Sequence, residues 1–498
     1  MPLRIHDTRR RRKEEFTTLE SGKVNMYVCG ITPYGPSHLG HARCYVAFDI
    51  VHRWLEAKGY DVLYVQNFTD IDDKILVVAE EEGVDFSVVS ERYIEAYFSN
   101  MDALNVLRAD EYPRVTGTIP GIIEMVQTLI DKGNAYVGDD GVYFEVESAP
   151  EKYGLLTGQS IEAVRAGAGG RVGDTGSGKR DHKDFALWKF SKPGEPEWDS
   201  PWGAGRPGWH IECSVMSSSF LGDQFDIHGG GHDLRFPHHE AEIFQGECAS
   251  GKSPVVQWWM HNGFVNVDGE KMSKSLGNFW TISDALNNFS GFTLRHALLN
   301  AHYRNPIDLS EDFLNDGKRN QERLEAAYLN ALEAWGGVPR ADLVSLPHAD
   351  ADADGLPATM AALEKLGEET ALAMDDDFNS REALTKVMAA GREMKKTLES
   401  GGLDEEDRSA FGLYCAEWLE ELAGSVLGLL PSREEALAGP EEDPRRLEIS
   451  GLVQELLLKR QIARDAGDWD SADAIRDELT AMGVTVVDTA DGPDWTLE

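Results

Sequence analysis

Residues 24–41, VNMYVCGITPYGPSHLGH, decide the fold of this chain. The apolar run 24–30 predicts a strand, the Pro- and Gly-containing residues up to Ser37 predict a loop, and residues 38–59 predict a helix with apolar residues at helical spacing. We expect Ser37 to cap this helix and Gly59 to end it. Residues 61–68 return as a strand, and a parallel pair with a crossover helix is typical of a doubly wound α/β sheet.

The rest of the chain predicts an insertion and two further domains. Residues 1–306 form the expected catalytic domain, interrupted at about 115–207 by a turn-rich connective insertion whose Gly-rich loop 166–179 lacks a Walker lysine pattern. Residues 307–436 predict a helical bundle, with helices at 312–335, 358–374, 380–400 and 405–430. Residues 437–498 predict a small C-terminal α/β domain. The fold class is therefore α/β: a Rossmann-like, doubly wound parallel sheet, then an α-helical bundle and a small terminal domain.

The chain is strongly acidic. Its 498 residues include 48 Lys and Arg against 87 Asp and Glu, a formal net charge of -39. Such a charge repels nucleic acid, because phosphate binding depends on basic side chains. The acidic residues are spread along the chain, which favours a whole surface adapted to a salty cell, where screening shortens the range of repulsion. We therefore expect a halophilic source, and the charge does not exclude a nucleic-acid substrate.

The cysteines and the N-terminus indicate a reducing interior. The five cysteines are an odd, widely separated set, which is not a disulfide framework. The N-terminus contains the basic run 9–12 but no apolar signal segment, and no apolar stretch approaches the roughly 20 residues that cross a bilayer. We expect a cytoplasmic protein with no membrane association, and an arginine run that is either solvated or close to a bound nucleic acid.

The first chemical motif is His38-Leu39-Gly40-His41. Its two imidazoles lie three residues apart at a helix start, so they share one face. Free N–H groups at a helix start attract anions, Gly40 leaves room for a nucleotide, and the two rings would stabilise charge at an α-phosphorus under attack. The alternative is two incidental histidines.

The second motif is KMSKS at residues 271–275, after a strand and an Asp-Gly turn. Lys271 and Lys274 would clamp the β- and γ-phosphates of ATP and the departing pyrophosphate. The alternative is a solvated basic loop. Together, the two motifs in one α/β core are much more specific than either alone.

The third feature is a set of candidate metal ligands: Cys29, Cys213, His238 and Glu242. A helix that begins near Pro237 would put its histidine and glutamate on one face, and two thiolates, an imidazole and a carboxylate suit Zn²⁺. On spacing alone, His239 or His232 could replace His238. Alternatively, Cys29 and Cys213 are buried core thiols that bind no metal. This is what we expect for Cys44, Cys248 and Cys415.

Several segments resemble those of cysteinyl-tRNA synthetases, in the same order: MYVCGITPYGPSHLGH, NFTDIDDKI, GRPGWHIECS, FDIHGGGHDLRFPHHE, EKMSKSLGN and, near the C-terminus, DWDSADAIRDEL. Leu39 replaces the commoner isoleucine of that family. The resemblance implies a class I aminoacyl-tRNA synthetase that activates L-cysteine with ATP to cysteinyl-adenylate and transfers it to the 3′-terminal ribose of tRNA(Cys). It implies no protein nucleophile and no obligatory protein partner.

The resemblance also implies the residues of the site. ATP, with Mg²⁺, would be bound by His38, Gly40, His41, Lys271 and Lys274, of which the histidines and lysines are catalytic. One zinc ion would be bound by Cys29, Cys213, His238 and Glu242, and the substrate cysteine by Thr69, Trp209, His228 and Asp233. Zinc would prefer the thiol of cysteine to the hydroxyl of serine, so no editing domain is needed.

Other functions remain as alternatives. A cysteine:amino-sugar ligase would share the core and the zinc site but would not need about 190 further residues of helical architecture. A non-catalytic, synthetase-like RNA-binding protein should have lost the ATP-site histidines or lysines, and a structural zinc protein leaves KMSKS unexplained. The candidate tRNA contacts, which are more often solvated helix faces, are Arg319, Arg323, Lys459, Arg460 and Arg464.

Overall fold

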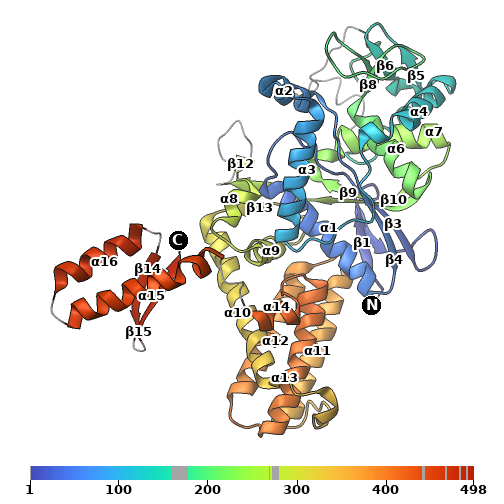
Figure 1. Cartoon of the computed structure of the whole chain (residues 1–498). Helices are drawn as coiled ribbons and strands as arrows, with labels where there is room; N and C mark the ends of the chain where they lie inside the picture. Colours follow the sequence, from blue (N-terminus) through green and yellow to red (C-terminus); the bar gives the residue numbers. More distant parts are fainter. Residues whose placement is uncertain are drawn as a thin grey trace. The chain divides into compact units, whose positions relative to one another are not determined.

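Four parallel strands form the central sheet, in the spatial order β10-β9-β3-β4. They are β3 (Lys23–Val28), β4 (Asp61–Gln66), β9 (Phe225–Gly231) and β10 (Val256–Asn262). Helix α1 (Leu39–Ala57) connects β3 to β4, and α7 (His238–Ser250) connects β9 to β10 (Figure 1). The connections leave β3 and β9 in opposite directions, and such a switch point opens a crevice at the carboxyl ends of the strands. The predicted Rossmann-like parallel sheet is confirmed.

The computed structural model describes residues 2–158, 178–267, 270–271, 280–439, 444–465, 468–481, 484–489 and 492–497. The chain divides into two compact units, residues 1–431 and 432–498. The domain borders that the sequence suggests, after residues 306 and 436, remain predictions.

Helix α1 begins one residue later than expected. His38, not Ser37, is the N-cap, with φ -118° and ψ 170°. Its Nδ1 accepts hydrogen bonds from the N–H groups of Gly40 and His41, and Nδ1 of His41 accepts the N–H of His38. An imidazole nitrogen thus takes the place of the hydroxyl oxygen that usually caps a helix. Gly59, with φ +85°, follows the end of the helix.

The insertion contains a sheet that the sequence did not predict. After α4 (Ile119–Asp131), strands β5 (Ala135–Val137), β6 (Gly141–Phe144), β7 (Phe185–Phe190) and β8 (Gly205–Pro207) form an antiparallel sheet in that order. Such short strands carry too little alternation to be distinguished from turns. Most of the predicted Gly-rich loop, 166–177, lies outside the described residues.

The remaining elements of the first unit surround the central sheet. They are β1 (Arg4–Asp7), β2 (Arg12–Glu15), α2 (Asp73–Glu82), α3 (Phe86–Ala103), α6 (Trp209–Leu221), β11 (Val265–Val267), β12 (Glu270–Lys271), α8 (Ile282–Leu286), α9 (Gly291–Leu299) and β13 (Ile307–Leu309). The arginine run closes the β1–β2 hairpin. Arg9 forms an ion pair with Glu247 at 2.6 Å, and Arg10 lies over the ring of Trp258 at 4.9 Å. These two arginines therefore anchor the hairpin rather than forming a freely solvated surface.

Four long helices pack as a bundle (Figure 1): α10 (Glu311–Trp335), α11 (Leu356–Asp375), α12 (Ser380–Glu399) and α13 (Glu405–Leu419). This confirms the predicted helices, except that the last continues only as a π-helical turn, η7 (Glu420–Val426). A buried ion cluster joins the bundle to α1. Asp49 accepts hydrogen bonds from Arg53 and Arg295, which also donate to the carbonyls of Ser425 and Leu427, respectively.

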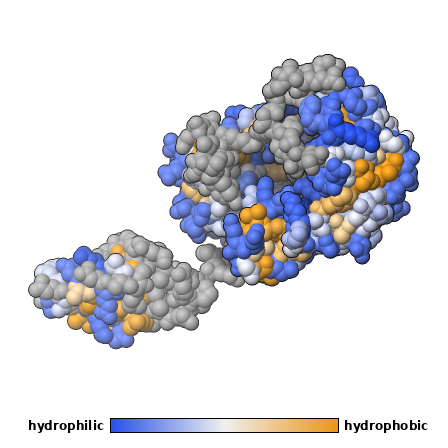
Figure 2. Space-filling model, turned by 90° about the horizontal axis from the view of Figure 1, so that it is seen from above, coloured by the Kyte–Doolittle hydropathy of each residue, from blue (hydrophilic) through white to orange (hydrophobic). Residues whose placement is uncertain are grey.

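The second unit contains helices and a strand pair, in agreement with the small α/β domain that the sequence predicts near the C-terminus. After the short α14 (Arg433–Ala438), helices α15 (Pro444–Asp465) and α16 (Trp469–Ala481) pack on the antiparallel strands β14 (Val484–Thr489) and β15 (Gly492–Leu497). Val453, Leu479 and Val484 lie in its small core. Most of the described surface seen in Figure 2 is hydrophilic. Within the described part of the chain, no helix is long and apolar enough to span a membrane.

Candidate metal and nucleotide site

Four of the predicted ligands meet at the switch point of the sheet. Cys29 directly follows β3, and its sulfur lies 3.7 Å from that of Cys213 on α6. On α7, Nε2 of His238 lies 3.4 Å from the Cys213 sulfur and 3.2 Å from Oε1 of Glu242. That oxygen lies 3.8 Å from the Cys29 sulfur. All four side chains are buried, so the structure brings these ligands together away from bulk water.

The distances between these atoms fit a zinc ion. With ordinary bond lengths, a tetrahedral zinc separates two sulfur ligands by about 3.8 Å, sulfur from nitrogen by about 3.6 Å, and nitrogen from oxygen by about 3.3 Å. The separations of Cys29, Cys213, His238 and Glu242 differ from these by at most a few tenths of an ångström. The donor set and the geometry therefore suit the same metal.

A second set of four shares two members with the first: Cys29, His228, His239 and Glu242. Its fit is poorer, because Nε2 of His239 lies 3.2 Å from the Cys29 sulfur but 3.9 Å from the carboxylate oxygen. It also replaces a thiolate with an imidazole. The other alternative, His232, is exposed and packs against Phe264, and it belongs to neither set.

Burial controls the protonation of the cluster. It raises the pKa of the Cys29 thiol and of the Glu242 carboxyl well above their ordinary values. Burial also lowers the pKa of His238 and His239 well below the usual range, and that of His228 to about 3. The imidazoles are therefore neutral and able to bind a metal, and a bound cation would bring the thiols to their thiolate form.

Two further histidines, which the sequence did not single out, orient the cluster. Nδ1 of His238 lies 3.0 Å from Nδ1 of His210. On the other side, Nδ1 of His239 lies 2.8 Å from Nε2 of His261, whose Nδ1 lies 2.8 Å from the hydroxyl of Thr8. Hydrogen bonds of this kind fix the tautomer of a metal-binding imidazole. The only sequence signal was the position of His210 inside GWHIEC.

Three consecutive glycines allow the surrounding groups to approach β9. A Cβ atom on Gly229 would lie 2.3 Å from the ring of Phe48 on α1. One on Gly230 would lie 2.9 Å from the ring of His239, and one on Gly231 would lie 2.6 Å from the Asp233 carboxylate. Any side chain in this run would displace a neighbour of the cluster.

The predicted cysteine-contacting residues lie at different distances from the cluster. His228 is fully buried, with Nε2 3.7 Å from the Cys29 sulfur. Trp209 is 40% exposed and stacks on His238, with ring centroids 4.4 Å apart. Thr69 is buried and donates a hydrogen bond of 3.2 Å to Glu212, a buried carboxyl that the sequence did not single out. Asp233 is exposed just beyond β9.

The backbone N–H groups at the start of the HLGH helix, which were expected to be free to bind an anion, already have hydrogen-bond acceptors. The rings of His38 and His41 stack at 3.7 Å between centroids. The N–H groups of residues 40 and 41 are occupied by the ring of His38, and that of Leu39 donates to the carbonyl of Trp280. These three N–H groups therefore do not form the predicted anion site. Since both Nδ1 atoms accept hydrogen bonds, the neutral rings carry their protons on Nε2.

The segment after the KMSKS motif is attached to the HLGH helix start. Lys271 ends β12, and Lys274 lies outside the described residues. The carbonyl of Trp280 accepts from Leu39, and the N–H of Ile282 donates to the carbonyl of Ser37. The described residues from Trp280 onward, which follow the second motif in the sequence, therefore lie beside the start of the HLGH helix.

A basic groove lies on the helical bundle. Arg319 and Arg323 of α10, together with Arg392 and Lys395 of α12, line a cavity of about 500 Å³, where Glu322 is the one acidic residue. The chain as a whole has a formal net charge of -39, so the lining is more basic than its average, although Arg319 also forms an ion pair with Asp316 of the same helix. Of the candidates in the second unit, Lys459 forms an ion pair of 2.7 Å with Glu455.

Comparisons with known proteins cover the whole chain. Residues 15–319 match the family model described as "tRNA synthetases class I (C) catalytic domain", residues 371–431 match the DALR domain, and residues 446–495 match the "Cysteinyl-tRNA ligase anticodon binding domain". The chain is 45% identical over 505 residues to the cysteine–tRNA ligase of Pelobacter propionicus, covering 100% of both. It is 47% identical over 495 residues to that of Moorella thermoacetica, covering 99% of both.

Solved structures share the fold. The methionyl-tRNA synthetase of Mycobacterium tuberculosis, in complex with methionyl-adenylate, superposes with a TM-score of 0.63 at 17% identity, covering 85% of this chain and 95% of that one. A leucyl-tRNA synthetase of Agrobacterium radiobacter K84, in a ternary complex with tRNA, gives a TM-score of 0.62 at 12% identity, covering 86% of each chain. At such identities the likeness concerns the fold alone.

Proposed function

The chain belongs to the cysteine–tRNA ligases, a family of class I aminoacyl-tRNA synthetases, and from this premise we propose the substrates and the residues of its reaction. The enzyme activates L-cysteine with ATP and Mg²⁺ to cysteinyl-adenylate, and then transfers the cysteinyl group to the 3′-terminal ribose of tRNA(Cys). Because charged tRNA is consumed in translation, we place this reaction in the cytoplasm.

Zinc held by Cys29, Cys213, His238 and Glu242 selects the substrate. The observation that carries this proposal is the tetrahedral spacing of the four buried ligand atoms. Bound there, zinc supplies a soft Lewis acid that prefers a thiolate to the hydroxyl of serine. A closed set of four protein ligands leaves no place for substrate. The proposal therefore requires either a fifth ligand position or the withdrawal of a weak ligand, for which we propose Glu242.

The remaining predicted residues hold the rest of the substrate. Trp209 and His228 border the cluster and form the walls of the cysteine site, and Thr69 and Asp233 contribute polar contacts. Thr69 is held by Glu212, which makes this glutamate a positioning residue. With Nδ1 used for capping, the Nε2–H groups of His38 and His41 are the donors that stabilise charge at the α-phosphate. Gly40 gives the nucleotide room, and Lys271 and Lys274 act on the pyrophosphate.

The basic groove of α10 and α12 binds the phosphate backbone of the tRNA. Four basic side chains against one acidic side chain in its lining make the groove complementary to a polyanion. The match of residues 446–495 to an anticodon-binding domain supports an RNA substrate over an amino sugar.

The test is charging of total tRNA with labelled cysteine, at high KCl, with ATP, Mg²⁺ and zinc-replete enzyme. Acid-precipitable cysteine that resists competition by excess serine is the expected result. Cysteine-dependent ATP–pyrophosphate exchange without any charging would instead indicate the amino-sugar ligase. Absence of both activities would indicate a non-catalytic RNA-binding protein.

A further inference from the structure

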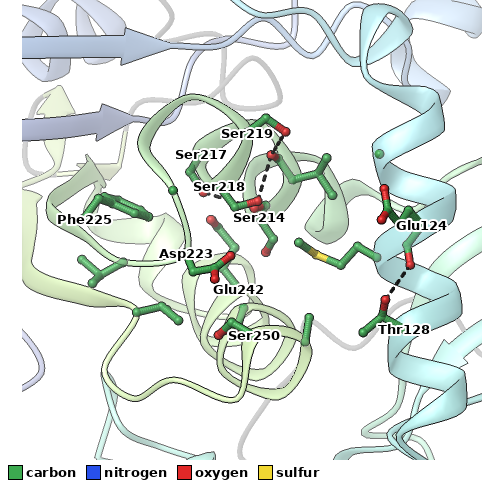
Figure 3. A pocket seen from close by; sticks show the side chains of 18 of the residues that line it. Glu124, Thr128, Ser214, Ser217, Ser218, Ser219, Asp223, Phe225, Glu242 and Ser250 are labelled. Atoms are coloured by element: carbon green, nitrogen blue, oxygen red, sulfur yellow. Dashed lines mark hydrogen bonds between the residues drawn. The ribbon is translucent and has the colours of Figure 1, made fainter.

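A cavity of about 330 Å³ lies between α4, α6 and α7 and reaches Glu242, one of the four proposed zinc ligands. Figure 3 shows Glu124 and Thr128 of α4 on one side, and Ser214, Ser217 and Ser218 of α6 on another. Its lining includes Glu242 but none of the residues predicted to bind cysteine or ATP.

The cavity runs from an exposed, acidic opening to a buried floor. Glu124 and Asp223 are exposed, and Asp223 forms an ion pair of 3.1 Å with Lys252. Glu242 and Trp259, at 5% and 1% exposure, form the buried floor of the cavity. All contacts of Glu242 with the cysteines and histidines are made by its Oε1 atom. Glu242 therefore belongs to both the metal cluster and the cavity.

The hydroxyl groups of the lining offer oxygen acceptors. The hydroxyls of Ser217, Ser218, Ser219, Ser250 and Thr128 each donate to a backbone carbonyl of their own helix, three or four residues earlier. Their hydrogens are thus used within the helices, and oxygen lone pairs remain as acceptors, although the Ser250 oxygen already accepts the N–H of Lys252. Lone pairs and carboxylates together favour a cation.

The cavity is polar at its floor as well as at its opening. The indole N–H of Trp259, a lining residue, has no hydrogen-bond partner among the described residues. A polar cavity of this size has room for water molecules. The lining is therefore suited to a hydrated ion rather than to an apolar ligand.

We propose that this cavity is the route by which zinc reaches and leaves the cluster, with Glu242 taking the ion from the cavity side. The inference rests on the proposed zinc function. The route allows the metal to exchange without passing through the cysteine site, and the acidic opening concentrates divalent cations there.

The test measures zinc transfer rates of the full-length enzyme. Release from the holoenzyme to an excess of chelator, and uptake of zinc ion by the metal-free enzyme, are followed with a zinc-responsive dye. Ser218→Phe narrows the cavity and Glu124→Lys reverses the charge at its opening. We expect each variant to slow both release and uptake about tenfold. The ratio of the release rate to the uptake rate should stay within about twofold of the wild-type ratio. Ser218→Ala and the distant Glu364→Lys are the matched controls and should keep wild-type rates.

Wild-type rates in Glu124→Lys and Ser218→Phe would overturn the route and leave the zinc function intact. Glu124 is exposed, so its variant decides the question even where the phenylalanine prevents folding. A wild-type enzyme that retains no zinc would refute the zinc part of the proposed function before any variant is compared.

Discussion

Nδ1 of His210 lies 3.0 Å from Nδ1 of His238, so one of these two nitrogens must carry a hydrogen and donate a hydrogen bond to the other. The opposite nitrogen of His238 faces Cys213 and Glu242. If Nε2 binds a metal, the proton of His238 is on Nδ1 and His210 is the acceptor. The orientation of a proposed zinc ligand therefore depends on a residue that binds no metal itself.

Replacement of His210 should weaken zinc binding without removing a ligand. For His210→Ala we expect a loss of affinity of about 10- to 100-fold, the range found when the hydrogen-bond partner of a ligand is removed. Competition with a chromogenic chelator measures it. His210→Asn, whose carbonyl oxygen can accept the same hydrogen bond, should retain most of the affinity. Equal affinity in the alanine variant and the wild type would contradict the assignment.

Removal of either cysteine ligand should abolish cysteine activation. We expect Cys29→Ala or Cys213→Ala to lose zinc and to lower the rate of cysteine-dependent ATP–pyrophosphate exchange by about 10³-fold, equivalent to the several kcal/mol of a metal Lewis acid. Circular dichroism should show an intact fold. Cys248→Ser, at a partly buried position outside the cluster, is the control. Exchange that persists in a metal-free variant would refute the zinc proposal.

His38 caps helix α1 and is proposed to act in the reaction as well, and substitutions separate the two roles. His38→Asn preserves an N-cap acceptor but lacks the Nε2 donor, so thermal stability should stay close to that of the wild type while adenylate formation falls about 10²- to 10³-fold. His38→Ala should lose the same activity and about 1 kcal/mol of stability as well. Single-turnover adenylate formation and thermal melts measure the two effects. An asparagine variant with full activity would exclude the proposed role.

The ion cluster of Asp49 should stabilise the first unit down to low pH. Although burial alone would raise it, Arg295 and Arg53 hold the pKa of Asp49 below its ordinary value. A carboxyl with a lowered folded-state pKa contributes stability that is present above its unfolded value of about 3.9 and lost as the pH falls through the folded value. Asp49→Asn should therefore cost about 3–5 kcal/mol at pH 7 and less in acid.

Thermal denaturation between pH 3 and pH 7 measures this difference. The exposed Glu81→Gln on α2 should change stability little at any pH and is the control. A double variant, Asp49→Asn with Arg295→Met, should recover part of the loss, because no uncompensated charge stays buried. A loss that is independent of pH would show that the ion pairs are not its source.

The basic groove should affect tRNA charging but not cysteine activation. We expect Arg392→Glu and Lys395→Glu to raise the KM for tRNA and to reduce the salt dependence of log KM by about one for each lost phosphate contact. ATP–pyrophosphate exchange should remain at the wild-type rate. Lys365→Glu on α11 changes the same charge outside the groove and should have little effect. An unchanged KM in all three variants would exclude the groove as a tRNA site.

Local patterns predicted the central sheet and the long helices, and motifs predicted that Cys29, Cys213, His238 and Glu242 would lie together, because each of these depends on strong periodicity or on a motif. The pairing of β5–β8 was not predictable, since strands of three to six residues carry little alternation. Neither was the contact of His210 with His238, nor the acceptor role of His38, because each depends on ring orientation rather than on spacing. Ser37 looked like a cap because hydroxyl residues are the usual ones.

Cys29 and Glu242 are separated by 213 positions in the chain. During synthesis, the first of them leaves the ribosome long before the last, so the nascent chain carries an isolated thiol and no metal site. The cluster can assemble only after β9 has docked beside β3, so the proposed metal can be captured only once the two halves of the central sheet have met. On the zinc proposal, a cell short of zinc would accumulate this protein with its sheet folded and the cluster empty.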